Sequence, residues 1–175
     1  MSETLREVRL ITVDPRASIA RLRFGAIDVP CAIGRSGIRA LKREGDGATP
    51  IGTWPMRKLL YRPDRLRQPS TALAVWAIEP SDGWCDDPSD LRYNRPVRLP
   101  YPASAETMWR DDHLYDLVVV LGYNDNPPVA NKGSAIFMHL ARPGYLPTEG
   151  CIALTREHML RLLSRCGPDT VVKVG

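Results

Sequence analysis

The sequence lacks the features of two large classes of protein. None of its apolar runs is long enough to cross a bilayer, which excludes a transmembrane helix. The basic residues are scattered instead of being grouped in a tail or stripe, and the net charge is only +4, so a nucleic-acid partner is not indicated. With 175 residues, 43% of them apolar and 25% charged, we expect one soluble globular domain spanning residues 1–175.

Motifs for metals and phosphates are also missing. The four cysteines form no CxxC pair, and no histidine stands at the spacing of a zinc site. The stretch REGDGATPIG lacks the GxxxxGK[ST] order of a phosphate-binding loop and does not lead from a strand into a helix. We therefore expect no metal and no cofactor. Four cysteines in a chain of this length do not make a disulfide framework, and a pairing of Cys31 with Cys85 stays open.

What the sequence does contain is the alternation typical of strands. The stretches REVRLITVD, SIARLRFG and AIDVPCAIG alternate apolar and polar residues and predict an antiparallel meander. Further strands are predicted by TWPMRKLLYR, TALAVWAIEP, LYDLVVVLGYN, SAIFMHLA and DTVVKVG. One helix is predicted by TREHMLRLLSRCG, capped by Thr155 and ended by Gly167. About eight strands and one good helix predict a mainly β sandwich or barrel with a peripheral helix.

The segments between the strands are long. Residues 34–52 are rich in glycine, which supplies turns with positive φ, so this segment is expected to be a loop. Residues 62–109 are rich in Pro, Asp, Trp and Tyr, and we expect long surface loops there that wall a cleft, because long loops in a compact domain are more often functional than idle. The stretch SAETMWRDD predicts a short helix capped by Ser104.

Cys151, in the stretch PTEGCIAL, differs from the other three cysteines. Cys31 lies in an alternating strand and Cys166 on the apolar face of the helix, which indicates burial in the core. Cys85 sits among acids that would raise the pKa of its thiol. Cys151 instead follows Gly150, whose backbone can turn tightly and leave the amides at 150 and 151 to bind a substrate oxygen. An acyl-transfer site requires this arrangement around its nucleophile.

His139 is the candidate base. It stands twelve residues before Cys151, near the end of a predicted core strand, and the loop LARPGYLPTEG can fold it back beside the thiol. Its imidazole could take the thiol proton or, once charged, hold the thiolate as an ion pair. His113, flanked by acids, and His158, in the first turn of the helix, are expected at the surface.

Taken together, GDGATPIG, the histidine in FMHLA and the stretch TEGCIAL resemble the L,D-transpeptidase catalytic domain, the YkuD-like family of peptidoglycan enzymes, over most of the chain. The resemblance implies a mixed β-sandwich whose cysteine attacks a carbonyl of a peptidoglycan stem peptide, after which an amine of a neighbouring stem resolves the thioester. It implies Cys151 as nucleophile, His139 as base and then acid, and the amides of Gly150 and Cys151 as oxyanion donors. A backbone carbonyl orients the imidazole in the family, and here we expect it from residues 148–150.

Two positions depart from the family pattern. Glu149 stands where a histidine is usual, and Ala153 stands where an arginine is common. The carboxylate of the substrate must therefore be recognised by other residues, and Arg142, Arg43 and Lys132 are the candidates.

The other candidates for the substrate site come from three places in the chain. Thr148 and Glu149 stand beside the nucleophile, and Trp84 belongs to the segment DGWCDDPSDLRYNRPV, which is expected to form part of the cleft. The pair Tyr123 and Asn124 is the third candidate, although it is equally typical of a plain turn after a core strand.

Two other functions stay open. If water resolves the thioester, the chain is an L,D-carboxypeptidase or a cysteine amidase acting on wall peptides; if Cys151 is structural, it is a non-catalytic wall-binding module. The cross-link type, 3-3 or 1-3, and the oligomeric state are also left open. The implied substrate places the protein in the periplasm, whereas the opening stretch MSETLREVRLITVDPRAS has no apolar core of a signal peptide and, taken literally, predicts the cytoplasm.

Overall fold

The alternating N-terminal stretches form the expected meander. In the computed structural model, which describes residues 4–175, strand β1 pairs antiparallel with β2, and β2 pairs antiparallel with β3. The strands are β1 (Glu7–Ile11), β2 (Ile19–Phe24), β3 (Ile27–Ala32), β4 (Ile38–Arg39), β5 (Thr49–Pro50), β6 (Gly52–Tyr61), β7 (Val75–Ala77), β8 (Asp82–Cys85), β9 (Pro96–Arg98), β10 (Ala105–Thr107), β11 (Leu117–Leu121), β12 (Phe137–Leu140), β13 (Ile152–Leu154) and β14 (Val171–Val174). The helices are the 3-10 turn η1 (Pro143–Tyr145) and the α-helix α1 (Arg156–Leu163).

The main sheet closes on itself. Its strand order is β11-β12-β13-β3-β2-β1-β14-β6-β7, and β11 also pairs with β6, so that β7 alone extends outside the ring. Most neighbours are antiparallel, but β1 with β14, β12 with β13, and β6 with β7 are parallel. The prediction of a mainly β fold with a peripheral helix is therefore confirmed, and the sheet is mixed.

Strand β11 shows how two apolar layers arise from one stretch of sequence. All five residues of LVVVL are buried, because alternate side chains point to opposite faces of the sheet. Leu117, Val119 and Leu121 join the large core inside the ring, while Val118 and Val120 join a second cluster outside it. This second cluster fills the space between the ring and a smaller sheet.

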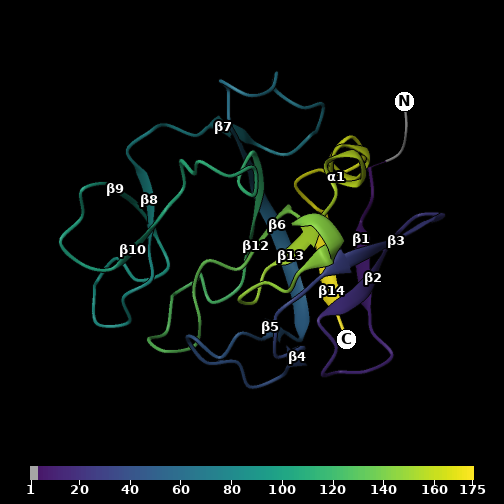
Figure 1. Cartoon of the computed structure of the whole chain (residues 1–175), viewed down its shortest axis with the longest axis horizontal. Helices are drawn as coiled ribbons and strands as arrows, with labels where there is room; N and C mark the ends of the chain where they lie inside the picture. Colours follow the sequence, from purple (N-terminus) through teal and green to yellow (C-terminus); the bar gives the residue numbers. More distant parts are fainter. Residues whose placement is uncertain (1–3) are drawn as a thin grey trace.

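The smaller sheet interrupts the long loops of residues 62–109. Strands β10, β8 and β9 form a three-stranded antiparallel sheet, which Figure 1 shows at the opposite end of the molecule from α1, and the rest of the segment is loop apart from β7. The expected helix at SAETMWRDD is wrong: Ala105–Thr107 is strand β10, paired with β8. Ser104 does not cap a helix, and its hydroxyl instead donates to Asp86 Oδ1 at 2.6 Å. Pairing with β8, together with burial of Met108 in the second cluster, outweighs the local helix preference.

Helix α1 covers one end of the ring. Its N-cap is Thr155, as expected, and the Thr155 side chain accepts a hydrogen bond from the His158 amide. The buried residues Met159, Leu162 and Leu163 all lie in the large core. Over residues 4–175, no helix is both long enough and apolar enough to span a membrane.

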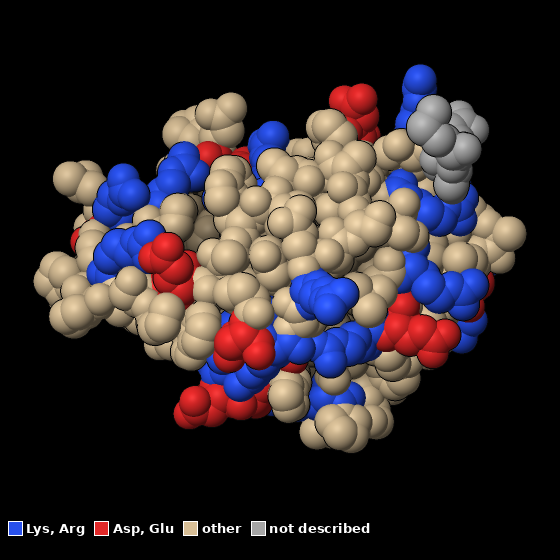
Figure 2. Space-filling model, turned by 90° about the horizontal axis from the view of Figure 1, so that it is seen from above, with Lys and Arg blue, Asp and Glu red and all other residues tan. Residues whose placement is uncertain are grey.

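Charged side chains of both signs are mixed on the surface. Figure 2 shows one face of the molecule, on which Lys and Arg lie beside Asp and Glu and do not gather into a single stripe. Ion pairs such as Arg21 with Asp28, at 2.7 Å, account for part of this mixing. Exposed pairs of this kind contribute little to stability.

Candidate active site

The alternation of strand β12 decides where His139 points. In FMHL, Met138 and Leu140 face the large core, whereas Phe137 joins the second cluster on the other face. His139 lies on the same face as Phe137, because side chains two residues apart share a face of a strand. The imidazole is thereby directed out of the ring, towards the smaller sheet.

Cys151 reaches the same face from the neighbouring strand. Strands β12 and β13 run parallel, with Met138 opposite Ile152, so Cys151 stands level with Phe137. The Phe137 amide donates to the Cys151 sulfur at 3.4 Å, and the thiol donates to the Ala135 carbonyl at 3.2 Å. The parallel pairing thus places the thiol and the imidazole on adjacent strands of one face.

The turn before Cys151 is held by Thr148. Its Oγ1 accepts a hydrogen bond from the Gly150 amide at 3.1 Å and donates to the Cys151 carbonyl at 2.7 Å. Gly150 has a φ of +138°, and a Cβ there would come within 2.8 Å of the Ala48 carbonyl oxygen. The glycine is required because the turn passes directly against the glycine-rich loop, whose Thr49 hydroxyl donates to the Gly150 carbonyl at 2.9 Å.

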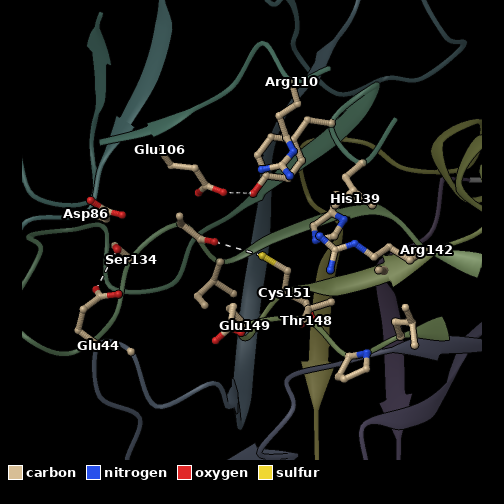
Figure 3. Close-up of a pocket in the computed structure, with 18 of the residues that line it drawn as sticks. Glu44, Asp86, Glu106, Arg110, Ser134, His139, Arg142, Thr148, Glu149 and Cys151 are labelled. Atoms are coloured by element: carbon tan, nitrogen blue, oxygen red, sulfur yellow. Dashed lines mark hydrogen bonds between the residues drawn. The ribbon is translucent and has the colours of Figure 1, made fainter. Parts of the chain in front are cut away.

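Both side chains open into one cavity of about 460 Å³. In Figure 3, Cys151 lies between Glu106 on one side and His139 with Arg142 on the other. The cavity is lined by residues from the glycine-rich loop, the smaller sheet, the segment before β11 and the segment 134–153: Lys42, Glu44, Gly45, Asp86, Glu106, Arg110, Leu114, Tyr115, Ser134, Ala135, Ile136, His139, Arg142, Leu146, Pro147, Thr148, Glu149, Cys151 and Ala153.

The His139 ring has one defined tautomer. Its Nδ1 lies 2.9 Å from the Leu140 carbonyl oxygen, and a carbonyl can only accept, so Nδ1 carries the proton and Nε2 holds the free lone pair. Burial lowers the pKa of His139 to about 4, despite the opposing effect of this hydrogen bond. The orienting carbonyl therefore belongs to Leu140, and not to residues 148–150 as the sequence suggested.

The Cys151 thiol is neutral in this state. Burial and then the negative charge of Glu106 raise the pKa of Cys151 to about 12. With the pKa of His139 near 4, the two groups form a neutral pair of thiol and imidazole at neutral pH. Of the two states that the sequence left open, these pKa shifts agree with general-base transfer and not with a preformed ion pair.

The comparison with family models identifies the chain's relatives. The model described as the L,D-transpeptidase catalytic domain, YkuD, matches residues 9–174.

The chain belongs to this family.

The resemblance carried by FMHLA and TEGCIAL is thereby confirmed, and it relates the chain to a family of enzymes and to peptidoglycan. No curated protein and no solved structure matches the chain.

Some of the site residues that the sequence predicted for this YkuD domain lie together, and others do not. Thr148, Glu149 and Arg142 line the cavity with Cys151 and His139, whereas the remaining candidates are not among the residues lining it: Arg43, Lys132, Tyr123, Asn124 and Trp84. Glu149 reaches the surface and pairs with Arg35 at 3.0 Å.

The residues outside the cavity have structural contacts of their own. Asn124 has a φ of +48°, and its amide donates to the carbonyls of Val129 and Gly133, which describes a turn. Tyr123 packs edge-on against Trp54. Trp84 donates from Nε1 to Asn94 Oδ1 at 2.9 Å and lines two smaller cavities nearby.

The other cysteines and histidines mostly match expectation. All four cysteines are buried and unpaired, and Cys31 and Cys166 lie in the large core. Burial raises the pKa of Cys85, the neighbouring acids Asp90, Asp86 and Asp87 raise it further, and a backbone hydrogen bond at Asp87 opposes them. The side chain of His113 is 78% exposed, as predicted for a surface residue. His158 differs, since it is half-buried in the first turn of α1.

The sequence missed the residues that close the cavity from the far side. Glu106 comes from β10, and Tyr115 and Arg110 come from the segment that follows it. The Tyr115 hydroxyl donates to Glu106, and the Tyr115 ring lies edge-on to the His139 ring at 5.4 Å between centroids. Only the acid-rich and aromatic composition of the segment signalled them, because their position depends on pairing of β10 with β8.

The pH dependence of the first chemical step tests the neutral pair. We expect thioester formation to be nearly constant from about pH 5 to 9 and to fall as the pH drops towards 4, where His139 is protonated and can no longer accept the thiol proton. The measurement is kcat/KM as a function of pH for a stem peptide that acylates Cys151. An acid limb centred near 6.5, the ordinary histidine value, would contradict the account.

A stability control belongs with that profile. Because the folded chain keeps His139 neutral while the unfolded chain binds a proton near pH 6.5, this residue's contribution to stability is lost as the pH falls from about 6.5 towards 4. Circular dichroism at each pH separates loss of fold from loss of the base.

Proposed function

We propose that this chain is a peptidoglycan L,D-transpeptidase that transfers an acyl group from a donor stem peptide to the amine of a neighbouring stem. The observation that carries the proposal is the placement of Cys151 and His139 in one cavity, with Nδ1 of the imidazole tied to the Leu140 carbonyl. This leaves Nε2 as the proton acceptor for the thiol. Because the substrate is a wall polymer, the proposed site of action is the periplasm.

The proposed acylation begins with rotation of the S–H bond. In the present state the thiol donates to the Ala135 carbonyl, so it must turn away from that oxygen before its proton passes to His139 Nε2. The sulfur then attacks the carbonyl carbon of the donor. The tetrahedral intermediate collapses as the amine of the terminal D-residue leaves with the proton held by His139, and a Cys151 thioester remains.

The Cys151 backbone amide is the proposed oxyanion donor. The Gly150 amide already donates to Thr148 Oγ1, so its role is to stabilise the turn and not to bind the oxyanion. An amine of the acceptor stem then attacks the thioester and restores the Cys151 thiol. Attack by water at this step would make the chain a carboxypeptidase, with the same residues in the first half of the reaction.

Product analysis tests the proposal. The purified chain is incubated with disaccharide-tetrapeptide muropeptides, and the products are separated and weighed by mass spectrometry. Cross-linked dimers are expected, and their fragmentation assigns the 3-3 or 1-3 linkage. Shortened monomers without dimers would mean hydrolysis, and unchanged substrate would favour a non-catalytic wall-binding module.

Arg142 is the proposed contact for the donor carboxylate. It is exposed, it lines the cavity beside His139, and no ion pair of its side chain is found within residues 4–175. Arg142→Ala is expected to raise the KM for the donor about tenfold, because a charge-assisted hydrogen bond is worth roughly 1.5–3 kcal/mol. Arg43→Ala is the matched control, since Arg43 does not line the cavity. Equal effects of the two substitutions would refute the assignment.

A further inference from the structure

Glu106 stands in the proposed catalytic cavity with one oxygen engaged and the other open. Its Oε1 accepts the hydroxyl of Tyr115, which is 5% exposed. Within residues 4–175, the structure shows no hydrogen bond to Oε2 of Glu106. The carboxylate lines the same cavity as Cys151, across from His139 (Figure 3). A carboxyl group with one open oxygen therefore lies in the same cavity as the sulfur that would carry the acyl group.

The other acids of the cavity are engaged differently. Glu44 Oε2 accepts from both the Tyr93 and the Ser134 hydroxyls, and Asp86 Oδ1 accepts from Ser104. These contacts hold the loops that surround the cavity. Glu106 is instead bound by a residue that also packs against the base, because the Tyr115 ring lies edge-on to the His139 ring.

We propose that Glu106, oriented by Tyr115, binds the ammonium group of the acceptor and removes one of its protons, so that a neutral amine attacks the Cys151 thioester. This inference rests on the proposed function and extends it to the second half of the reaction. Glu106 would be a catalytic residue, because it touches the acceptor amine, and Tyr115 would be a positioning residue that acts through Glu106.

The proton balance of this step closes. The acceptor, R–NH₃⁺, gives one proton to the Glu106 carboxylate, and its nitrogen lone pair then forms the new C–N bond at the thioester carbonyl. His139 Nε2 takes a second proton from that nitrogen and passes it to the sulfur as the C–S bond breaks. The products are the amide, the Cys151 thiol and a neutral Glu106 carboxyl group, which returns its proton to solvent.

The surroundings of Glu106 suit a base for an amine. Burial raises the pKa of Glu106, against the opposing effects of the Tyr115 hydrogen bond and of the positive charge of Arg110. The charges of Asp86 and Glu44 raise it further. A carboxylate with a raised pKa accepts a proton more readily, and its location in a partly closed cavity strengthens its attraction for a cation.

The test separates amines by their charge. Thioester formed from a tetrapeptide donor is partitioned at pH 7 between water and either ethylamine, which is protonated, or aminoacetonitrile, which is largely neutral. Glu106→Gln keeps an acceptor for the Tyr115 hydroxyl but removes the charge. It is expected to lower the ratio of aminolysis to hydrolysis about tenfold or more for ethylamine and for the natural acceptor stem, and to change it by less than about twofold for aminoacetonitrile.

Controls keep the result interpretable. Glu79→Gln removes a carboxylate that is paired with Arg98 outside the cavity, and it should leave both ratios unchanged. Tyr115→Phe should lower the ratio of aminolysis to hydrolysis for ethylamine but not for aminoacetonitrile, as Glu106→Gln does, and by a smaller factor. A merely structural role of Tyr115 would lower the ratio equally for both amines. Raising the pH should restore ethylamine transfer in Glu106→Gln, because the amine then arrives neutral.

Each outcome is decisive. An unchanged ethylamine ratio in Glu106→Gln, or an equal loss with both amines, would overturn the role of Glu106 while leaving the proposed transpeptidase function intact. Absence of any thioester in the unmodified chain would overturn the proposed function and this inference with it.

Discussion

Cys151→Ala is expected to abolish both cross-linked and shortened products, with a loss of at least about 10⁴-fold in kcat/KM. The reason is that no other thiol can reach the substrate. Cys31 and Cys166 are packed in the large core, and Cys85 is fully buried. The measurement is the product yield from tetrapeptide muropeptides under conditions in which the unmodified chain turns over.

The control for this substitution is the stability of the fold. Cys151 contributes the sulfur that accepts the Phe137 amide, and removing that acceptor costs roughly 1 kcal/mol. A thermal unfolding midpoint close to that of the unmodified chain therefore shows that the loss is chemical. Cys151→Ser keeps the size and polarity of the side chain and should also be nearly inactive, because a neutral hydroxyl is a weaker nucleophile. If Cys151→Ala retained more than about 1% of the activity, Cys151 would not be the nucleophile.

His139→Asn is expected to lower kcat/KM by about 10² to 10⁴-fold. Asparagine can keep a donor near the Leu140 carbonyl, but it offers no basic nitrogen where Nε2 stands. Because asparagine also removes the ring that packs against Tyr115, circular dichroism of the variant is the control for the fold. The rate of thioester formation, followed by release of the terminal D-residue, is the measurement.

His113→Asn provides the matched control for that substitution. His113 is largely exposed and contacts Asp116 through Nδ1 at 2.9 Å, away from the cavity. Its replacement should change kcat/KM by less than about twofold. Full activity of His139→Asn would show that the thiol loses its proton by another route. It would contradict the claim that His139 takes the proton of the neutral Cys151 thiol.

The parts of the site that follow local rules were predictable from the sequence. The alternation in FMHL turns His139 away from the core, and the order Thr148, Gly150, Cys151 describes a turn that only glycine can complete. The glycine-rich segment was predicted to be a loop, but its contact with Gly150 through Thr49 joins residues that are 101 positions apart. No local pattern encodes that contact.

The far wall of the cavity could not be predicted for the same reason. Glu106 belongs to a stretch whose local preference favours a helix, yet β10 pairs with β8 and directs Glu106 towards Tyr115. The candidates Tyr123 and Asn124 stand beside a core strand, as a cleft residue can, but their side chains close a turn. Distinguishing the two cases requires knowing which loop lies opposite the strand.

The two departures from the family pattern also have structural meanings. Glu149 lines the cavity and pairs with Arg35 at the surface. Ala153 lies opposite His139 in the parallel pairing and lines the cavity. Its small side chain leaves space beside the imidazole, where Arg142 supplies positive charge from the following loop.

The central claim is that Cys151 carries the acyl group, and peptide mapping after acid quenching tests it most directly. The chain is mixed with a disaccharide-tetrapeptide donor in the absence of an acceptor, quenched within the first turnovers, digested and analysed by mass spectrometry. The account predicts one acyl adduct, on the peptide that contains Cys151, and its absence in Cys151→Ala. No adduct on this peptide, or an adduct on Cys31, Cys85 or Cys166 instead, would contradict it.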